Sequence, residues 1–168
     1  MNRKLNRRVS KNPAVRTVKG NLRGGRLRIG IVLGKFNRAV TDELLAGAMA
    51  GLKNSGVRET DIGTFRVPGA FEIPLTARRL AGSGLFDAII CLGAVIRGDT
   101  PHFEYICSAV SQGIMEAMLG TGVPIIFGVL TTDTVHQARE RADAGGIDRG
   151  GDAAKTAVEM VHLLRGIK

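Results

Sequence analysis

The chain has 168 residues, 44% of them hydrophobic, which is enough for one domain with a buried core. No apolar run approaches the roughly 18–20 residues that span a bilayer, and no secretory signal is visible, so we expect a cytoplasmic protein. The two cysteines lack CxxC spacing and the three histidines are scattered. This argues against a zinc or redox site and favours buried, reduced thiols.

The net charge of +9 belongs mainly to the start of the chain. Residues 1–25 contain eight Lys or Arg and no Asp or Glu, which leaves 16 basic and 15 acidic residues in 26–168. We therefore predict a basic, mostly disordered extension at 1–25, followed by a single domain. Such an extension could attract nucleic acid non-specifically, acidic lipids or an acidic partner, and its composition loosely resembles a transit peptide. It lacks aromatic residues for base stacking.

The first half of the domain predicts two strands that alternate with two helices. An apolar stretch at 26–36 predicts a buried strand, and the stripe within 41–56 predicts a helix with Thr41 as its N-cap. A short strand at 62–68 and a helix at 72–84 follow.

The second half of the domain repeats this alternation. The pattern predicts strands at 86–96 and 123–133, helices at 102–122, 134–143 and 152–165, and a Gly-rich connection at 145–151. Alternating strands and helices predict a parallel sheet, and nearly continuous apolar strands predict helices on both of its faces.

In such a sheet, ligands bind at the carboxyl ends of the strands. A polar turn that ends in His102 falls at this edge. We predict that Thr100 caps a helix that begins at Pro101, so that free backbone N–H groups form an anion site. His102 would then lie beside the anion, where it could donate to it or carry protons, although a surface capping residue is the alternative. The segments expected at this edge are 34–37, 67–74, 97–102 and 131–133.

Two more residues at this edge leave alternatives open. Glu72 could accept hydrogen bonds from a polyol or an amine, or it could simply stabilise the start of a helix. Phe36 could stack on a flat ring or pack within the protein. His136 and His162 are expected on solvated faces. Neither G-x-G-x-x-G after a strand nor a Walker sequence is present, which disfavours a dinucleotide or ATP site.

Several blocks in order together resemble one protein family. They are GKFN, LLAGAMAGL, VPGAFEIP, LGAVIRGDTPHFEYI, PIIFGVLTTD and QARERA, and the resemblance runs from about residue 26 to the C-terminus. The chain is similar to 6,7-dimethyl-8-ribityllumazine synthases. This implies a flavodoxin-like three-layer α/β/α fold with a four-stranded parallel sheet. It also implies condensation of 5-amino-6-(D-ribitylamino)uracil with 3,4-dihydroxy-2-butanone 4-phosphate, a late step of riboflavin biosynthesis, without metal or organic cofactor.

The resemblance also implies roles for individual residues. His102 matches the proton-transfer residue. Residues matched to ribitylaminouracil binding are Phe36, Ala70, Phe71, Glu72, Val95, Ile96 and Phe127. Residues matched to phosphate binding are Gly98, Asp99, Thr100 and Arg141. Phe127 and Arg141 match residues that reach the site from a neighbouring subunit. Without the resemblance, Arg141 would be interpreted as an ordinary helix-surface charge.

The resemblance further implies a homo-oligomer with sites between subunits: a pentamer, a paired pentamer or a 60-subunit shell. The loop 145–151 lacks the extra residues that accompany isolated pentamers in some members, which favours the shell. Riboflavin synthase or acidic cargo would be further partners. The segment Asp148-Arg149-Gly150 departs from the family's frequent Asn-Lys-Gly, which leaves a site role for Arg149 in doubt.

A non-catalytic lumazine or flavin carrier of the same fold is the alternative function. A nucleic-acid-binding domain is disfavoured, because 26–168 is nearly neutral.

Overall fold

The central element of the fold is a four-stranded sheet with all strands parallel, in the order β2-β1-β3-β4. We describe it from a computed structural model, which covers residues 18–167. The strands are β1 (Ile29–Gly34), β2 (Ile62–Val67), β3 (Ala88–Ile96) and β4 (Ile125–Thr132). Each is shorter than its predicted range, because the apolar pattern continues into the adjoining turns.

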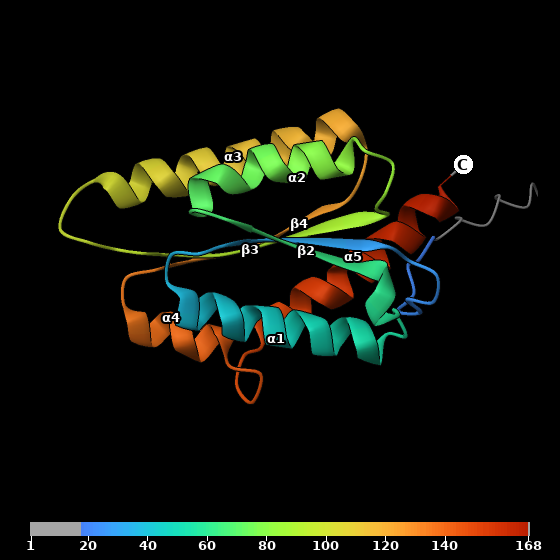
Figure 1. Cartoon of the computed structure of the whole chain (residues 1–168), viewed down its shortest axis with the longest axis horizontal. Coiled ribbons are helices and arrows are strands. Elements are labelled where there is room, and N and C mark those ends of the chain that lie inside the picture. Colours follow the sequence, from blue (N-terminus) through green and yellow to red (C-terminus); the bar gives the residue numbers. More distant parts are fainter. Residues whose placement is uncertain (1–17, 168) are drawn as a thin grey trace, which may run out of the picture.

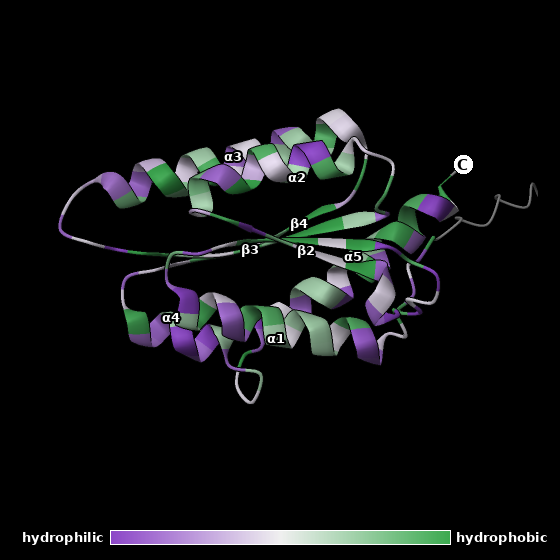
Figure 2. Ribbon diagram, in the orientation of Figure 1, coloured by the Kyte–Doolittle hydropathy of each residue, from purple (hydrophilic) through white to green (hydrophobic). Residues whose placement is uncertain are grey.

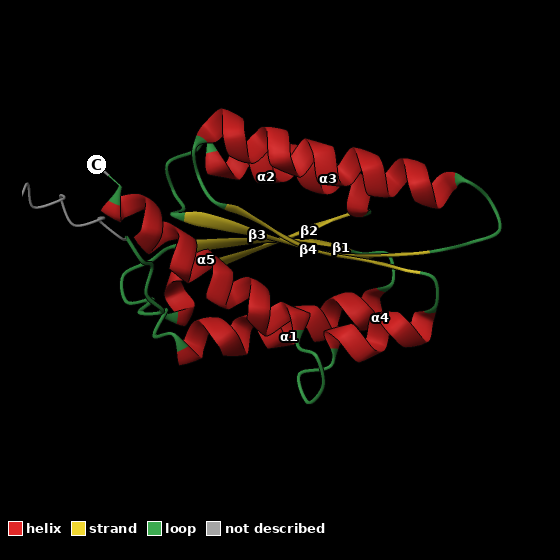
Figure 3. Ribbon diagram, turned by 180° about the vertical axis from the view of Figure 1, so that it is seen from behind, coloured by secondary structure: helices red, strands yellow, loops and turns green. Residues whose placement is uncertain are grey.

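Helices cover both faces of the sheet (Figures 1 and 3). One layer contains α2 (Ile73–Ala81) and α3 (His102–Thr121), and the other contains α1 (Arg38–Asn54), α4 (Val135–Ala142) and α5 (Arg149–Gly166). The predicted flavodoxin-like three-layer α/β/α sandwich is therefore confirmed. Among residues 18–167, the helices are too short or too polar to cross a membrane.

The core consists of two apolar clusters, one on each face of the sheet. Alternate residues of β1 point to opposite faces, so Ile31 and Leu33 pack under α1 and α5 while Val32 packs under α2 and α3. Figure 2 shows the apolar strands between the two helix layers. Each fully buried Leu or Ile contributes roughly 1.5–3 kcal/mol. Cys91 is also buried, which raises the pKa of its thiol, whereas Cys107 is only partly buried.

Two helices begin earlier than predicted. Thr41 is not the N-cap of α1: it is fully buried inside the helix, and its hydroxyl donates to the Arg38 carbonyl oxygen at 3.2 Å. Asn37 occupies the capping position in the left-handed conformation, with φ 55°. Similarly, α5 follows Asp148, whose φ is 52° and whose side chain accepts from the Gly151 N–H at 2.9 Å. Asn and Asp tolerate this conformation better than most residues.

Residues 18–25, which belong to the predicted extension, lie against the domain. The Gly24 N–H donates to the Ser55 carbonyl oxygen at the end of α1. The Nε2 atom of His162 on α5 lies 2.6 Å from the Arg23 carbonyl oxygen. His162 is therefore half-buried, and the prediction of a solvated position was wrong; His136 is exposed, as predicted. The prediction of disorder for 1–17 lies outside the described residues.

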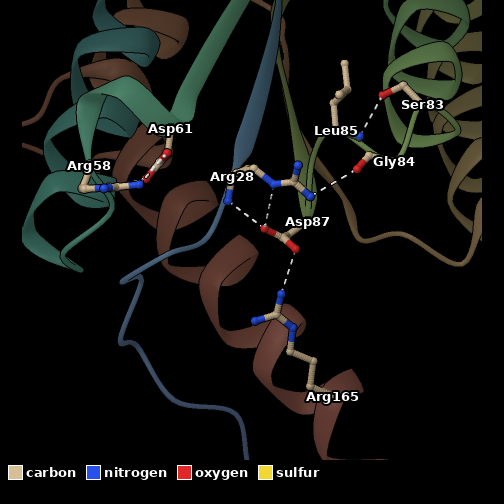
Figure 4. A network of polar contacts seen from close by, with 8 residues as sticks. All are labelled: Arg28, Arg58, Asp61, Ser83, Gly84, Leu85, Asp87 and Arg165. Carbon is tan, nitrogen blue, oxygen red and sulfur yellow. Dashed lines mark hydrogen bonds and ion pairs between the residues drawn. The ribbon is translucent and has the colours of Figure 1, made fainter.

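Asp87 joins three elements at the edge of the sheet opposite the carboxyl ends of the strands (Figure 4). It accepts from the Arg28 backbone N–H and from the Arg165 side chain of α5, both at 2.7 Å. The Arg28 side chain also donates to the Gly84 carbonyl oxygen at 3.2 Å. The end of α5 is thus fastened to the starts of β1 and β3.

We expect Asp87→Ala to lower the free energy of unfolding by about 1–2 kcal/mol. Hydrogen bonds to charged groups contribute about 1.5–3 kcal/mol, and this figure is reduced here because both arginine side chains are half-exposed. Urea unfolding followed by circular dichroism measures the change. Glu43→Ala is the control, since this exposed α1 carboxylate has no ion-pair partner within 18–167. Equal stability of the two variants would contradict the prediction.

Candidate functional site

The loops at the carboxyl edge of the sheet enclose a pocket of about 760 Å³. They follow β1, β2 and β3, and the pocket is closed on one side by the first turns of α3. The lining residues are Phe36, Asn37, Gly69, Ala70, Phe71, Glu72, Ala94, Val95, Ile96, His102, Tyr105 and Ile106. Its surface is mainly apolar, with a few polar groups, as is usual for a small-molecule site.

Phe36 reaches the pocket because the chain turns sharply after β1. The turn is held by the Asn37 side chain, which donates to the Ala94 carbonyl oxygen of β3 at 2.8 Å. The Lys35 N–H donates to the Val67 carbonyl oxygen of β2 at 2.9 Å. Phe36 remains 73% exposed, so its ring is accessible to a ligand. Sequence reasoning missed Asn37, although an Asn between a strand and a helix is a signal for a left-handed turn.

Glu72 ends the 3-10 helix Ala70–Glu72 and precedes α2. Its Oε2 atom accepts from the Gly69 N–H at 2.8 Å, so the carboxylate is held against the turn. A Cβ atom at Gly69 would lie 3.1 Å from Phe36 Cδ2 and 3.2 Å from Glu72 Oε2. Gly69 therefore leaves room for both side chains, and it is a second pocket residue that sequence reasoning missed.

The turn after β3 brings a possible anion site next to the pocket, but not with the predicted cap. Val95 and Ile96 are half-buried and line the pocket, whereas the turn Gly98–Thr100 is exposed and adjoins it. Helix α3 begins at His102, with Pro101 in the capping position and no side-chain cap. The Thr100 cap was thus a wrong prediction, because the helix starts one residue later. The N–H groups of its first turn still lack partners within the helix.

Arg97 connects this turn to two neighbouring elements. Its Nε donates to Asp133 Oδ1, just after β4, at 2.7 Å, and Nη1 donates to Glu104 of α3. Its guanidinium carbon lies 4.2 Å from the centre of the Phe103 ring. The hydrogen bonds to Asp133 and Glu104 raise the pKa of Arg97, and the bond from Arg97 lowers the pKa of Glu104.

Phe127 and Arg141 do not reach this pocket within one chain. They line a second groove of about 720 Å³ along β4, an outer strand of the described sheet, and this groove shares no lining residue with the first pocket. Arg149 also lines this groove. The Arg141 Nη1 atom donates to the Gln137 carbonyl oxygen at 3.0 Å, so the side chain folds back along α4.

The structure therefore divides the predicted residues into three groups. His102 and six of the residues matched to ribitylaminouracil binding line the first pocket, the turn Gly98–Thr100 adjoins it, and Phe127 and Arg141 lie in the second groove. Within the described part of the chain, no group of three or more His, Cys, Asp or Glu side chains is placed to hold a metal ion.

The chain also matches a known protein family. The model of the family described as 6,7-dimethyl-8-ribityllumazine synthase matches residues 26–165. The matched range includes all four strands and every residue that lines the two pockets.

Proposed function

The chain belongs to the 6,7-dimethyl-8-ribityllumazine synthase family, and from this premise we propose the reaction that it catalyses. The proposed substrates are 5-amino-6-(D-ribitylamino)uracil and 3,4-dihydroxy-2-butanone 4-phosphate. The products are 6,7-dimethyl-8-ribityllumazine, phosphate and water, in the penultimate step of riboflavin biosynthesis. The observation that carries this proposal is the pocket in which an accessible aromatic ring, a carboxylate and a histidine meet beside a helix N-terminus.

The pyrimidine substrate binds in the first pocket. Its flat ring stacks on Phe36 and rests against Val95 and Ile96. Ala70 and Phe71 form the wall along which the ribityl chain lies, and Glu72 accepts hydrogen bonds from its hydroxyl groups. The Gly69 N–H keeps this carboxylate in place.

The phosphate substrate binds at the turn Gly98–Thr100. Backbone N–H groups at the start of α3 favour an anion there. Arg141 adds a planar guanidinium that binds phosphate with two parallel hydrogen bonds. Arg141 lies in the second groove of its own chain, so in this proposal a neighbouring copy supplies it to the phosphate.

The reaction joins the two substrates in three stages. The amine of the uracil attacks the ketone, and loss of water gives a Schiff base. Phosphate then leaves, and the ring closes with loss of a second water. Much of the acceleration comes from holding the substrates together. His102 lies in the same pocket and carries protons between the reacting groups, as an aid rather than as a nucleophile.

An assembly with sites between subunits is part of the proposal. The groove with Phe127 and Arg141 lies along β4, an outer strand of the described sheet, and the rim of the first pocket exposes Phe71 and Tyr105 at 58% and 74%. Large exposed apolar side chains of this kind are typical of interfaces. A head-to-tail contact between two different surfaces gives a ring when its rotation closes, and from the family resemblance we propose a pentamer, either alone or as the unit of a 60-subunit shell.

The test is formation of lumazine from the two substrates, followed by absorbance. We expect His102→Ala to lower kcat by about 10–100-fold, at or below the usual contribution of a positioned acid–base group, because His102 is an aid rather than a nucleophile. His136→Ala, which removes an exposed histidine on α4, is the matched control and should leave kcat unchanged.

The outcomes separate the proposals. Full activity of His102→Ala would remove the proton-transfer role while leaving the reaction in place. No product from the folded and assembled wild type would overturn the enzyme proposal in favour of a carrier that binds lumazines or flavins.

A further inference from the structure

Arg97 stands between strand β3 and the turn Gly98–Thr100. Its backbone N–H donates to the Thr132 carbonyl oxygen at 2.9 Å, so the start of the turn is fastened to the end of β4. The side chain then extends to Asp133 and Glu104, and the Phe103 ring packs against its guanidinium. Three elements thus meet on one arginine directly before the turn.

The charges around Arg97 matter for an anion at this turn. Asp133 and Glu104 are both more than half exposed and would each place a negative charge beside it. Neither carboxylate contacts a second cation within residues 18–167. The cluster of Arg97, Asp133 and Glu104 therefore carries one net negative charge. Without the Arg97 side chain it would carry two negative charges, and both would repel a phosphate dianion.

We propose that Arg97 is a positioning residue for the phosphate substrate: it pairs the two carboxylates beside the turn Gly98–Thr100 and thereby keeps the turn able to accept an anion. This inference rests on the proposed function, because it concerns the affinity for the phosphate-bearing substrate. Arg97 touches Asp133, Glu104 and Phe103 and acts through them.

The first test is steady-state kinetics of Arg97→Met, with each substrate varied in turn. The KM for the phosphate substrate is expected to rise by about tenfold, as for unit charges separated by several ångströms near a surface. The KM for the uracil substrate should change by less than about threefold. Arg97→Lys keeps the charge but not the planar fork or the stacking on Phe103, so charge pairing predicts a KM for the phosphate substrate well below that of Arg97→Met. Arg58→Met is the control, since Arg58 forms a similar pair with Asp61 (Figure 4), and this pair precedes β2, at the end of the strand opposite the carboxyl edge.

The second test separates charge pairing from simple tethering. The triple variant Arg97→Met, Asp133→Asn, Glu104→Gln has no side-chain charges left in the cluster. We expect it to recover most of the affinity for the phosphate substrate, although the tether is absent. If Arg97→Met does not fold, the double variant Asp133→Asn, Glu104→Gln tests charge pairing instead. It keeps Arg97 and removes both negative charges, so its KM for the phosphate substrate should fall below that of wild type.

Three results decide the matter. An inactive wild type would overturn the proposed reaction and with it the substrate assigned to this turn. If wild type is active and Arg97→Met has an unchanged KM for the phosphate substrate, the role of Arg97 is overturned while the proposed reaction stands. A triple variant no better than Arg97→Met, or a double variant no better than wild type, would overturn charge pairing as the cause.

Discussion

Replacing Gly150 by alanine is expected to lower the free energy of unfolding by about 3 kcal/mol or more. Gly150 lies in the first turn of α5, where this helix crosses α1. A Cβ atom there would overlap the Leu44 carbonyl oxygen and lie 2.9 Å from the Ala48 nitrogen. Both atoms belong to the backbone of α1, so they cannot rotate away as a side-chain end could. The helices would have to separate, which is at the upper end of the cost of overpacking.

Urea unfolding measures this change, and Gly120→Ala is the matched control. Gly120 is also a helical glycine, but beyond its chain neighbours and the backbone of its own helical turns no atom lies within 4 Å of the position that its Cβ would take. Alanine there should leave stability unchanged or raise it by up to about 1 kcal/mol. A Gly150→Ala variant as stable as the control would show that the approach of α5 to α1 is looser than the structure indicates.

The sequence predicts the buried middle of each helix better than its first turn. Apolar periodicity marks the buried part of a helix, so the five α-helices and four strands within residues 18–167 were predicted, whereas the two short 3-10 helices were not. It says nothing about the first turn, whose start depends on one residue with a special backbone conformation. Asn37 and Asp148 both have positive φ, and the two helices that follow them begin before their apolar stripes.

The candidate site was predictable where the topology brings strand ends together. Phe36, Glu72 and His102 follow three different strands, and the carboxyl edge of a parallel sheet places them in one pocket. Gly69 was missed because its role is to leave space for the Phe36 and Glu72 side chains, and no sequence pattern around Gly69 indicates that these side chains lie next to it. Arg141 came only from the family resemblance, because a charge on an exposed helix face looks alike whether it is solvated or contacts a neighbouring copy.

Arg141→Ala is expected to lower kcat/KM by about 100-fold, chiefly through a higher KM for the phosphate substrate. A bidentate pair with phosphate comprises two charge-assisted hydrogen bonds, and the loss of about 3 kcal/mol corresponds to this factor. Steady-state kinetics with the phosphate substrate varied measures it. Arg139→Ala, an exposed arginine on the same helix, is the control. An unchanged KM in Arg141→Ala would remove the phosphate role.

Subunit mixing then tests where Arg141 acts. His102→Ala and Arg141→Ala subunits are refolded together in equal amounts, and their activity is compared with that of each variant alone. In a head-to-tail ring, a site with an intact His102 from one copy and an intact Arg141 from the next should form at about a quarter of the positions. With the phosphate substrate well below its KM, where each variant alone is nearly inactive, recovery to about that fraction of wild-type activity is expected, since the two residues lie in different grooves of one chain. Activity no higher than the average of the separate variants would mean that each chain supplies both residues to its own site.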